Sequence, residues 1–438
     1  APLKYSGLTP SEIWISEAQE RMVLSVEPSK VEMIAEICSR HGADMCDLGE
    51  FGTPDCALIL TYNDTIVGEL DMAFMHDGLP STTREATWSP AQPVQGSDLA
   101  IDIQSMLPRL FAHPNIASKQ SIVQQYDHEV QGRSVVRPFV GPQGNAPSDA
   151  AVITPVRGSS RGLAIGSGLA TGLCSDPHTM AMAAIDECVR NIVCVGGDPT
   201  RIAILDNFCW PSAKDKDSLG RLVRCAHGCY DAAKAYGTPF ISGKDSLNNQ
   251  FTTKSGETIY IPPTLLISGF GIVDDIATCV TMDAKSEGNV LVLVGETTSA
   301  MGGSHLLMLE PDSACDHTLP AVSLDDGPKI AKTIHAAIRN GHVQSAHDCS
   351  EGGFLVAAAE MTFGGSLGLS LHMEEDMELA SWCFAESPSR YLLEVRHEDI
   401  DALCSLLDEI PHAVVGTFDE THTLTIGDHS WSIEELEQ

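Results

Sequence analysis

The same pattern of apolar residues occurs twice, early and late in the chain. In each copy a Glu is followed four positions later by an Arg, and the Arg leads into a short apolar run. The pairs are Glu17 with Arg21 and Glu386 with Arg390, and the apolar runs are residues 22–26 and 391–395. Runs of this length and composition predict a β-strand in both places.

A helix in the same register is predicted after each of these strands. Apolar residues recur at a spacing of three in both copies, as Val31, Ile34 and Ile37 in the first and as Ile400, Leu403 and Leu406 in the second. Gly49 and Gly416 then close the copies, each shortly before a Phe. We therefore expect the chain to open near the end of one repeat and to contain a second repeat whole.

Strands alternate with helices through the rest of the chain. The predicted strands span residues 57–60, 65–70, 150–155, 162–167, 201–206, 264–273 and 289–295, and the predicted helices span 177–195, 219–236, 328–340 and 352–363. This alternation is typical of α/β or α+β layers and excludes a helical bundle or a β-sandwich.

A stretch rich in Pro, Ser, Thr and Gly interrupts the periodicity at residues 76–105. Such composition marks loops and linkers. The expected organisation is a partial domain at 1–75, this linker, and two domains at 106–283 and 286–438. A length of 438 residues agrees with two to three domains.

Composition and charge narrow the function classes. The hydrophobic content of 43% indicates a globular protein, and no apolar run reaches the length of a membrane helix. A net charge of -34 argues against nucleic acid, which is held by clustered Lys and Arg. The first residues show no export signal, and most of the 14 cysteines fall in apolar patterns typical of buried free thiols. We expect a cytoplasmic protein that binds neither nucleic acid nor membrane.

Two features could hold a metal ion. A Gly/Pro-rich loop delivers Asp149 at the start of an apolar strand, although an Asp there often only begins a strand or caps a turn. On the predicted helix 177–195, Glu187 and Asn191 are four residues apart and share a face. Their oxygens suit a hard cation such as Mg²⁺. A solvated polar stripe is the alternative, but this helix is otherwise apolar.

Two loops could contact phosphate. Gly243-Lys244-Asp245-Ser246 combines a glycine, an ammonium and a hydroxyl but lacks P-loop spacing, and a tight turn explains it equally well. Residues 345–354 place Ser350 and two glycines before a helix, where free amides favour an anion. A hydrolase triad in this segment is disfavoured, because no nucleophile elbow is present there. Zinc binding by Cys225 and Cys229 is also disfavoured, since no second ligand pair follows.

These motifs together resemble the phosphoribosylformylglycinamidine synthase family over nearly the whole chain. The matching segments, in the family's order, are residues 148–153, 187–199, 205–210, 243–246 and 347–353 together with both repeat strands. The resemblance implies a tandem of aminoimidazole ribonucleotide synthetase-like units, one complete and one truncated. It also implies an ATP-dependent ligase of purine synthesis that converts formylglycinamide ribonucleotide to its amidine with glutamine-derived ammonia.

The resemblance also implies roles for individual residues. Metal-binding positions are Asp149, Glu187, Asn191 and Asp348. Nucleotide-binding positions are Ser148, Gly243, Lys244 and Ser350, although some members carry Asn where Lys244 stands. Substrate-binding positions are Glu17, Ala18, Gln19 and Ser246, with Ala18 replacing the family's Ser. The family's catalytic His belongs to the first unit's N-terminal domain, so no catalytic residue is assigned here.

The implied ligands are Mg²⁺ and ATP, or an ADP held structurally. The implied partners are formylglycinamide ribonucleotide, the missing first synthetase unit, and a glutaminase domain or subunit that supplies ammonia. One alternative is a nucleotide-binding scaffold with no activity alone. Another is a different ATP-using member of the superfamily, such as a selenophosphate synthetase, a thiamine-phosphate kinase or a hydrogenase-maturation protein.

Overall fold

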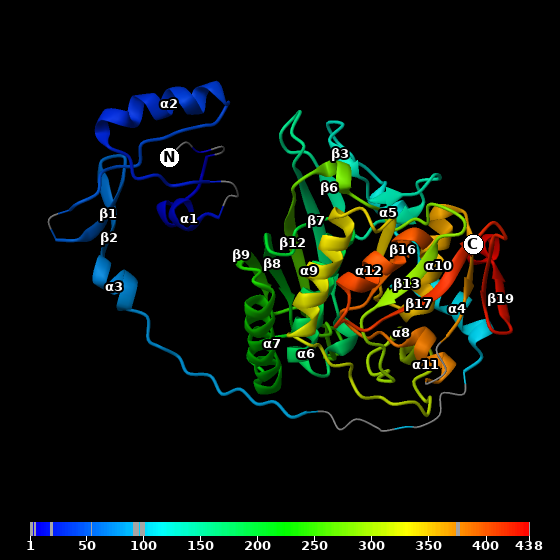
Figure 1. Cartoon of the computed structure of the whole chain (residues 1–438). Coiled ribbons are helices and arrows are strands. Elements are labelled where there is room, and N and C mark those ends of the chain that lie inside the picture. Colours follow the sequence, from blue (N-terminus) through cyan, green and yellow to red (C-terminus); the bar gives the residue numbers. More distant parts are fainter. Residues whose placement is uncertain are drawn as a thin grey trace. The chain divides into compact units, whose positions relative to one another are not determined.

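The computed structural model describes residues 3, 6–17, 21–53, 55–90, 96, 101–373 and 377–437. Its contacts divide the chain into two compact units, Ala1–Arg84 and Glu85–Gln438 (Figure 1). Both contain helices and strands, which confirms the mixed α/β class. No helix in the described part of the chain is long and apolar enough to cross a membrane.

The first unit contains one hairpin and a few helices. Its elements are α1 (Pro10–Ile15), η1 (Pro28–Lys30), α2 (Val31–Arg40), β1 (Ala57–Tyr62), β2 (Thr65–Asp71) and α3 (Met72–Asp77). The strands β1 and β2 are antiparallel, and they pair only with each other among the described residues. None of the described residues of this unit is buried. The helix and both strands predicted after residue 30 are confirmed.

The strand predicted at residues 22–26 is wrong. This segment has no regular secondary structure, and Met22 is 86% exposed. A strand needs a hydrogen-bonding neighbour, and no described strand of the unit lies beside this segment. In the second copy, β16 (Tyr391–Val395) pairs on both sides, with β13 (Val290–Val294) and β14 (Ser345–Asp348). The same local pattern therefore becomes a strand only where neighbours exist.

The second unit begins with a six-stranded sheet in the order β3-β6-β7-β12-β8-β9. These strands are β3 (Ser134–Val136), β6 (Ala151–Ile153), β7 (Gly162–Leu169), β12 (Thr264–Val273), β8 (Ile202–Cys209) and β9 (Phe240–Ser246). Only the β8–β9 pair is parallel. Two-stranded ribbons join β4 (Phe139–Val140) to β5 (Ala146–Pro147) and β10 (Gln250–Thr252) to β11 (Thr258–Tyr260).

Two long helices accompany this sheet, α6 (Pro177–Cys194) and α7 (Lys216–Tyr236). The helix α6 packs against β7, β12 and α7. Buried and half-buried residues alternate along β12, so one face of the sheet meets the helix. The approach is close, because a Cβ at Gly271 would lie 2.4 Å from Ile192 on α6. The N-cap of α6 is Asp176, whose side chain accepts from the His178 amide, and Pro177 occupies its first position.

A seven-stranded sheet follows, in the order β14-β16-β13-β17-β15-β18-β19. The remaining strands are β17 (His412–Asp419), β15 (Gly368–Leu371), β18 (Thr423–Ile426) and β19 (His429–Ser432). The helices are α4 (Ile103–Phe111), α5 (Gln120–Val123), α8 (His305–Leu309), α9 (Asp326–Arg339), α10 (Gly353–Gly365), α11 (Leu379–Phe384), α12 (Ile400–Leu406) and α13 (Ile433–Leu436), with single 3₁₀ turns η2 (Thr171–Leu173), η3 (Ile276–Thr278) and η4 (His397–Asp399).

One apolar core joins the two sheets of this unit. It includes Ile192 of α6, Ile267 of β12, Ile334 of α9 and Leu393 of β16. A second core surrounds α10, which is apolar all round and therefore buried. The predicted strands and helices of residues 150–363 are confirmed to within a few residues at their ends. Together, the cores fix α6 relative to β14 and α10, the elements that line the site.

Candidate functional site

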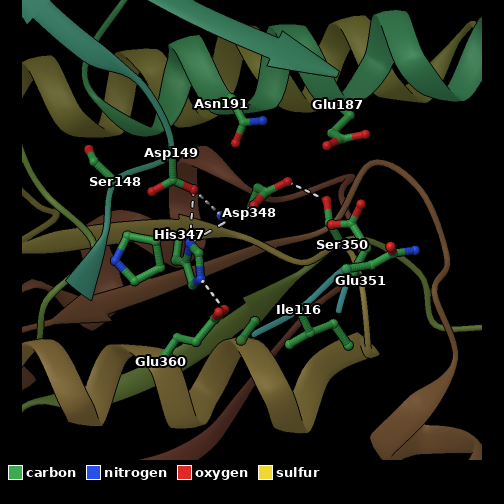
Figure 2. A pocket seen from close by; sticks show the side chains of 13 residues that line it. Ile116, Ser148, Asp149, Glu187, Asn191, His347, Asp348, Ser350, Glu351 and Glu360 are labelled. Carbon is green, nitrogen blue, oxygen red and sulfur yellow. Dashed lines mark hydrogen bonds and ion pairs between the residues drawn. The ribbon is translucent and has the colours of Figure 1, made fainter. Parts of the chain in front are cut away.

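A polar cavity of about 190 Å³ lies between α6 and the β14–α10 segment (Figure 2). It is lined by Asn115, Ile116, Pro147, Ser148, Asp149, Glu187, Asn191, His347, Asp348, Ser350, Glu351, Ala357 and Glu360. Six of these are residues predicted from the sequence, namely Ser148, Asp149, Glu187, Asn191, Asp348 and Ser350. The fold therefore gathers into one cavity residues that are up to about 200 positions apart.

Asp149 offers one oxygen to the protein and keeps the other unused. Its Oδ1 accepts from His347 Nδ1 and from the Asp348 amide, both at 2.8 Å. Its Oδ2 is buried and has no hydrogen-bond partner among the described residues. Burial raises the pKa of Asp149, because it disfavours the charged carboxylate. A buried oxygen without a partner is costly unless a ligand or ion satisfies it.

His347 lies between two carboxylates. Its Nδ1 contacts Asp149, and its Nε2 contacts Glu360 Oε2 at 3.0 Å (Figure 2). Burial alone would lower the pKa of His347, but Asp149 and Glu360 together raise it well above its ordinary value. The ring therefore favours the imidazolium form, with both nitrogens contacted by carboxylates. It cannot coordinate a metal in this state, although one of its nitrogens and oxygens of Asp149 and Asp348 lie within 4.8 Å of one another.

Asp348 and Ser350 are held from α6 by Arg190. The Arg190 guanidinium donates to Ser350 Oγ at 2.8 Å and to Asp348 Oδ2 at 3.3 Å. Ser350 Oγ donates to the same Asp348 oxygen. These contacts occupy Asp348 Oδ2 and leave Oδ1 for another partner. The α10 N-cap that follows, Gly352, has a φ of +77°, a backbone conformation that favours glycine.

Glu187 and Asn191 project from the same face of α6 toward the cavity (Figure 2). Glu187 Oε2 accepts from the Leu169 amide at 2.9 Å, and Asn191 Nδ2 donates to the Ser167 carbonyl at 2.8 Å. That orientation leaves the Asn191 Oδ1 as an acceptor for a ligand. Burial, then Glu351 and Asp348, raise the pKa of Glu187 well above its ordinary value.

The cavity carries an excess of negative charge. Asp149, Glu187, Asp348, Glu351 and Glu360 line it, whereas the cations that contact these carboxylates among the described residues are His347 and Arg190. Burial, then Glu386 and Asp348, raise the pKa of Glu351 to about 7. A hard divalent cation would relieve this crowding and would satisfy Asp149 Oδ2. The donor set, carboxylate and amide oxygens, fits Mg²⁺.

Asn115 is positioned in the cavity by a chain of contacts that the sequence did not predict. Its Nδ2 lies 3.0 Å from His305 Nε2, and His305 Nδ1 lies 3.0 Å from Glu386 Oε1. The same Glu386 oxygen accepts from the Gly352 amide at 2.8 Å. Glu386 is the second-copy counterpart of Glu17, and its Oε1 is used internally.

The other predicted site residues do not line this cavity. Gly243, Lys244 and Ser246 lie on β9, the edge strand of the six-stranded sheet. A Cβ at Gly243 would lie 2.5 Å from the Asp206 carboxylate, and Lys244 Nζ donates to Ser246 Oγ. Glu17 is exposed in the first unit. Ala18 and Gln19 lie outside the described residues.

Sequence reasoning missed Arg190, Glu360 and Asn115, and it assigned no role to His347, which lies in the segment where a hydrolase triad was disfavoured. The sequence held one usable signal, which is that Arg190 follows Asp186 by four residues on an otherwise apolar helix. The partners of His347 and Asn115 come from distant segments, and no spacing along the chain indicates them.

Family models place the fold in a known class. The model "AIR synthase related protein, N-terminal domain" matches residues 147–273, and "AIR synthase related protein, C-terminal domain" matches residues 286–429. The cavity lies where these two matched regions meet, since Asp149, Glu187 and Asn191 come from the first and Asp348 from the second.

Individual relatives narrow the class further. The chain is 33% identical over 432 residues to the phosphoribosylformylglycinamidine synthase subunit PurL of Alkaliphilus metalliredigens, covering 95% of this chain and 55% of that protein. It is 32% identical over 446 residues to the subunit of the same name from Deinococcus radiodurans, covering 97% of this chain and 57% of that protein. The chain belongs to the phosphoribosylformylglycinamidine synthase family. It spans about half the length of the curated relatives it matches.

Solved structures agree in fold. PurL of T. maritima complexed with FGAR matches with a TM-score of 0.59 at 15% identity, covering 77% of this chain and 54% of that one. The same protein complexed with ATP matches with a TM-score of 0.53 at 18% identity, covering 68% and 47%. At these identities the likeness establishes the fold alone.

Proposed function

We propose that this chain is part of a phosphoribosylformylglycinamidine synthase, which converts formylglycinamide ribonucleotide to its amidine with ATP and glutamine-derived ammonia. The observation that carries the proposal is the cavity, where six predicted ligand residues converge around the unpartnered Asp149 Oδ2. The names of the relatives agree with it. A glutaminase domain or subunit is the proposed source of ammonia, and the cytoplasm is the proposed location.

The residues of the cavity suit the chemistry. Asp149, Glu187, Asn191 and Asp348 would hold Mg²⁺, and Ser148 and Ser350 would contact the nucleotide. When bound, Mg²⁺ would neutralise phosphate charge, which phosphorylation of an unreactive amide oxygen requires. The chain's own contribution is to orient the ligands, because His347 and Arg190 fix one oxygen each of Asp149 and Asp348.

The residues outside the cavity are proposed to contact substrate. Gly243 and Lys244 would meet nucleotide and Ser246 substrate, while Glu17, Ala18 and Gln19 would form a substrate-binding segment. Exposure on β9 supports accessibility, since Gly243 and Lys244 are exposed and Ser246 is half-buried.

The proposed organisation is a tandem of two synthetase-like units, one truncated and one complete. Its segments are the tail of the first unit at 1–75, a linker at 76–105, and the two domains of the second unit at 106–283 and 286–438. Burial supports the truncation. Leu403 of α12 is fully buried, whereas its counterpart Ile34 on α2 is only half-buried, in a unit none of whose described residues is buried. The missing first unit is the proposed partner that covers Ile34 and its helix α2.

A second candidate is a nucleotide-binding scaffold that holds ADP without turnover. The observation that favours it is that the two cationic groups at the cavity, His347 and Arg190, are both fully engaged by the protein. His347 has carboxylates on both nitrogens, and Arg190 contacts Asp186, Asp348 and Ser350. No histidine among the described residues lining the cavity is thus left to transfer a proton.

Calorimetry with Mg-ADP on the 438-residue chain tests the site, and an assay with formylglycinamide ribonucleotide, ATP and ammonium chloride tests turnover. Binding is expected, and Asp348→Ala should weaken it at least tenfold, whereas Asp312→Ala on an exposed loop should not. Binding without turnover would favour the scaffold. Absence of binding by the unaltered chain would contradict the site assignment.

A further inference from the structure

We infer that Arg190 is a positioning residue that, with Asp186, clamps the two halves of the cavity together; this inference rests on the proposed function. Glu187 and Asn191 come from α6, whereas Asp348 and Ser350 come from β14 and the loop after it. A bound ion that contacts both sets requires them to stay in a fixed relative position. Arg190 does not line the cavity.

The clamp is a continuous buried chain of polar contacts. The side chains of Arg190 and Asp186 are 5% and 1% exposed and form an ion pair. On one side, Arg190 reaches Ser350 and Asp348. On the other, Asp186 accepts from the Ser389 amide at 2.9 Å and from Ser389 Oγ at 2.6 Å.

Both ends of this series of polar contacts therefore attach to the half of the cavity that contains β14 and the neighbouring strand β16. Ser389 precedes β16, and it adopts a φ of +59°, which is uncommon for a residue other than glycine. Tyr236 at the end of α7 donates to Asp186 as well. Two neighbouring turns of α6 thus hold two separate segments of the other half.

The planar guanidinium is essential to this geometry. One terminal nitrogen of Arg190 contacts Asp186, while the other contacts Asp348 and Ser350. A lysine carries the same charge, but its ammonium is a single point that cannot hold partners on two sides at once. Arg190→Lys therefore separates positioning from charge.

The matched control is Ile192→Val on the same helix. Ile192 is fully buried and packs on the sheet side of α6, against Gly269 and Gly271. Its truncation lowers stability through packing and leaves every contact of Arg190 in place. If lower stability by itself weakens ligand binding, Ile192→Val will show that loss of affinity too.

The test measures Mn²⁺ binding by electron paramagnetic resonance, ADP binding by calorimetry, and Tm, all on the full 438-residue chain. Arg190→Lys is expected to weaken both ligands at least tenfold while the chain remains folded. Asp186→Asn, which lies outside the cavity, should weaken them in the same direction. The double variant should lose about as much as Arg190→Lys alone, because the two residues act as one unit.

The outcomes separate this inference from the function on which it rests. If the unaltered chain binds but Arg190→Lys and Asp186→Asn bind equally well, the clamp is overturned and the function stands. If Ile192→Val loses as much affinity as Arg190→Lys, positioning is also overturned. If the unaltered chain binds neither ligand, the proposed function fails together with this inference. If Arg190→Lys does not fold, the affinity of Asp186→Asn is compared with that of the unaltered chain and of Ile192→Val instead.

Discussion

His347 and Asp149 are joined by a hydrogen bond of 2.8 Å between Nδ1 and Oδ1, although they lie 198 residues apart in the sequence. The side chains are 8% and 1% exposed. Because Glu360 Oε2 contacts the other ring nitrogen, His347 places a single cationic ring between two carboxylates in the cavity wall. The pair connects the strand start at Asp149 with β14.

Replacing His347 by Gln should destabilise the metal-free protein by about 3 to 5 kcal/mol, since it leaves buried carboxylates without their cation. Urea unfolding in the presence of EDTA measures the change. His227→Gln is the control, because His227 is exposed on α7 and should change stability by less than about 0.5 kcal/mol. A loss below about 1 kcal/mol for His347→Gln would contradict the buried imidazolium.

Asp149→Asn should abolish the stabilisation that divalent metal confers. Asn keeps the shape of the side chain and an acceptor for His347, but the charged oxygen without a partner is lost. Mg²⁺ or Mn²⁺ should raise the Tm of the unaltered chain by mass action, and EDTA should reverse the rise. The variant should bind Mn²⁺ at least tenfold more weakly. An equal metal-induced rise in the variant would exclude Asp149 as a ligand, and Asp312→Asn should behave as the unaltered chain.

Much of the fold could be predicted from the sequence, because burial on one face produces periods of 2 and 3.6 residues. The strand Thr264–Val273 and the helix Pro177–Cys194 follow those periods closely. The strand expected at residues 22–26 failed for a different reason. Its apolar pattern is suitable, but a strand is completed by neighbours in the sheet, and local sequence does not report them.

The candidate site could be predicted only in part, for a related reason. Glu187 and Asn191 were recognised because four residues on a helix bring side chains to one face. The residues that position the ligands, Arg190, His347 and Glu360, act across elements that meet only when the two sheets of the unit pack together. Their roles depend on tertiary geometry.

Glu351 should make stability depend on pH. Burial raises the pKa of Glu351 to about 7 in the folded chain, whereas an unfolded Glu titrates near its ordinary value of 4.5. Between these values the folded state binds more protons than the unfolded state. Its contribution to stability is therefore present at low pH and is lost as pH rises through about 7.

The urea midpoint of the unaltered chain should accordingly fall, relative to that of Glu351→Gln, between pH 5 and pH 8, and the difference should level off above about pH 8. Measuring the difference between the two chains removes the contributions of the histidines, which both share. Glu434→Gln, at an exposed position of α13, serves as the control and should track the unaltered chain. Parallel pH profiles for Glu351→Gln and the unaltered chain would show that Glu351 does not titrate in this range.

A short segment ahead of the second unit's first helix packs on α7, and Gly220 makes the contact possible. The Thr87 amide donates to the Lys216 carbonyl at 3.0 Å, and Arg224 lies 3.9 Å from the centre of the Trp88 ring. A Cβ at Gly220 would lie 1.9 Å from the Thr87 carbonyl oxygen. A side chain at position 220 would therefore overlap the backbone of Thr87.

The contact can therefore be tested by whether Gly220→Ala raises or lowers the stability of the protein. In the interior of a free helix, Ala in place of Gly stabilises by about 1 kcal/mol. Here the methyl group must displace the backbone of Thr87, so we expect a loss of about 1 kcal/mol or more in urea unfolding, with greater exposure of Trp88 in its fluorescence. Lys216→Ala removes only an exposed ion pair with Glu85 and should cost less than about 1 kcal/mol. A gain in stability for Gly220→Ala would mean that the segment does not rest on α7 in solution.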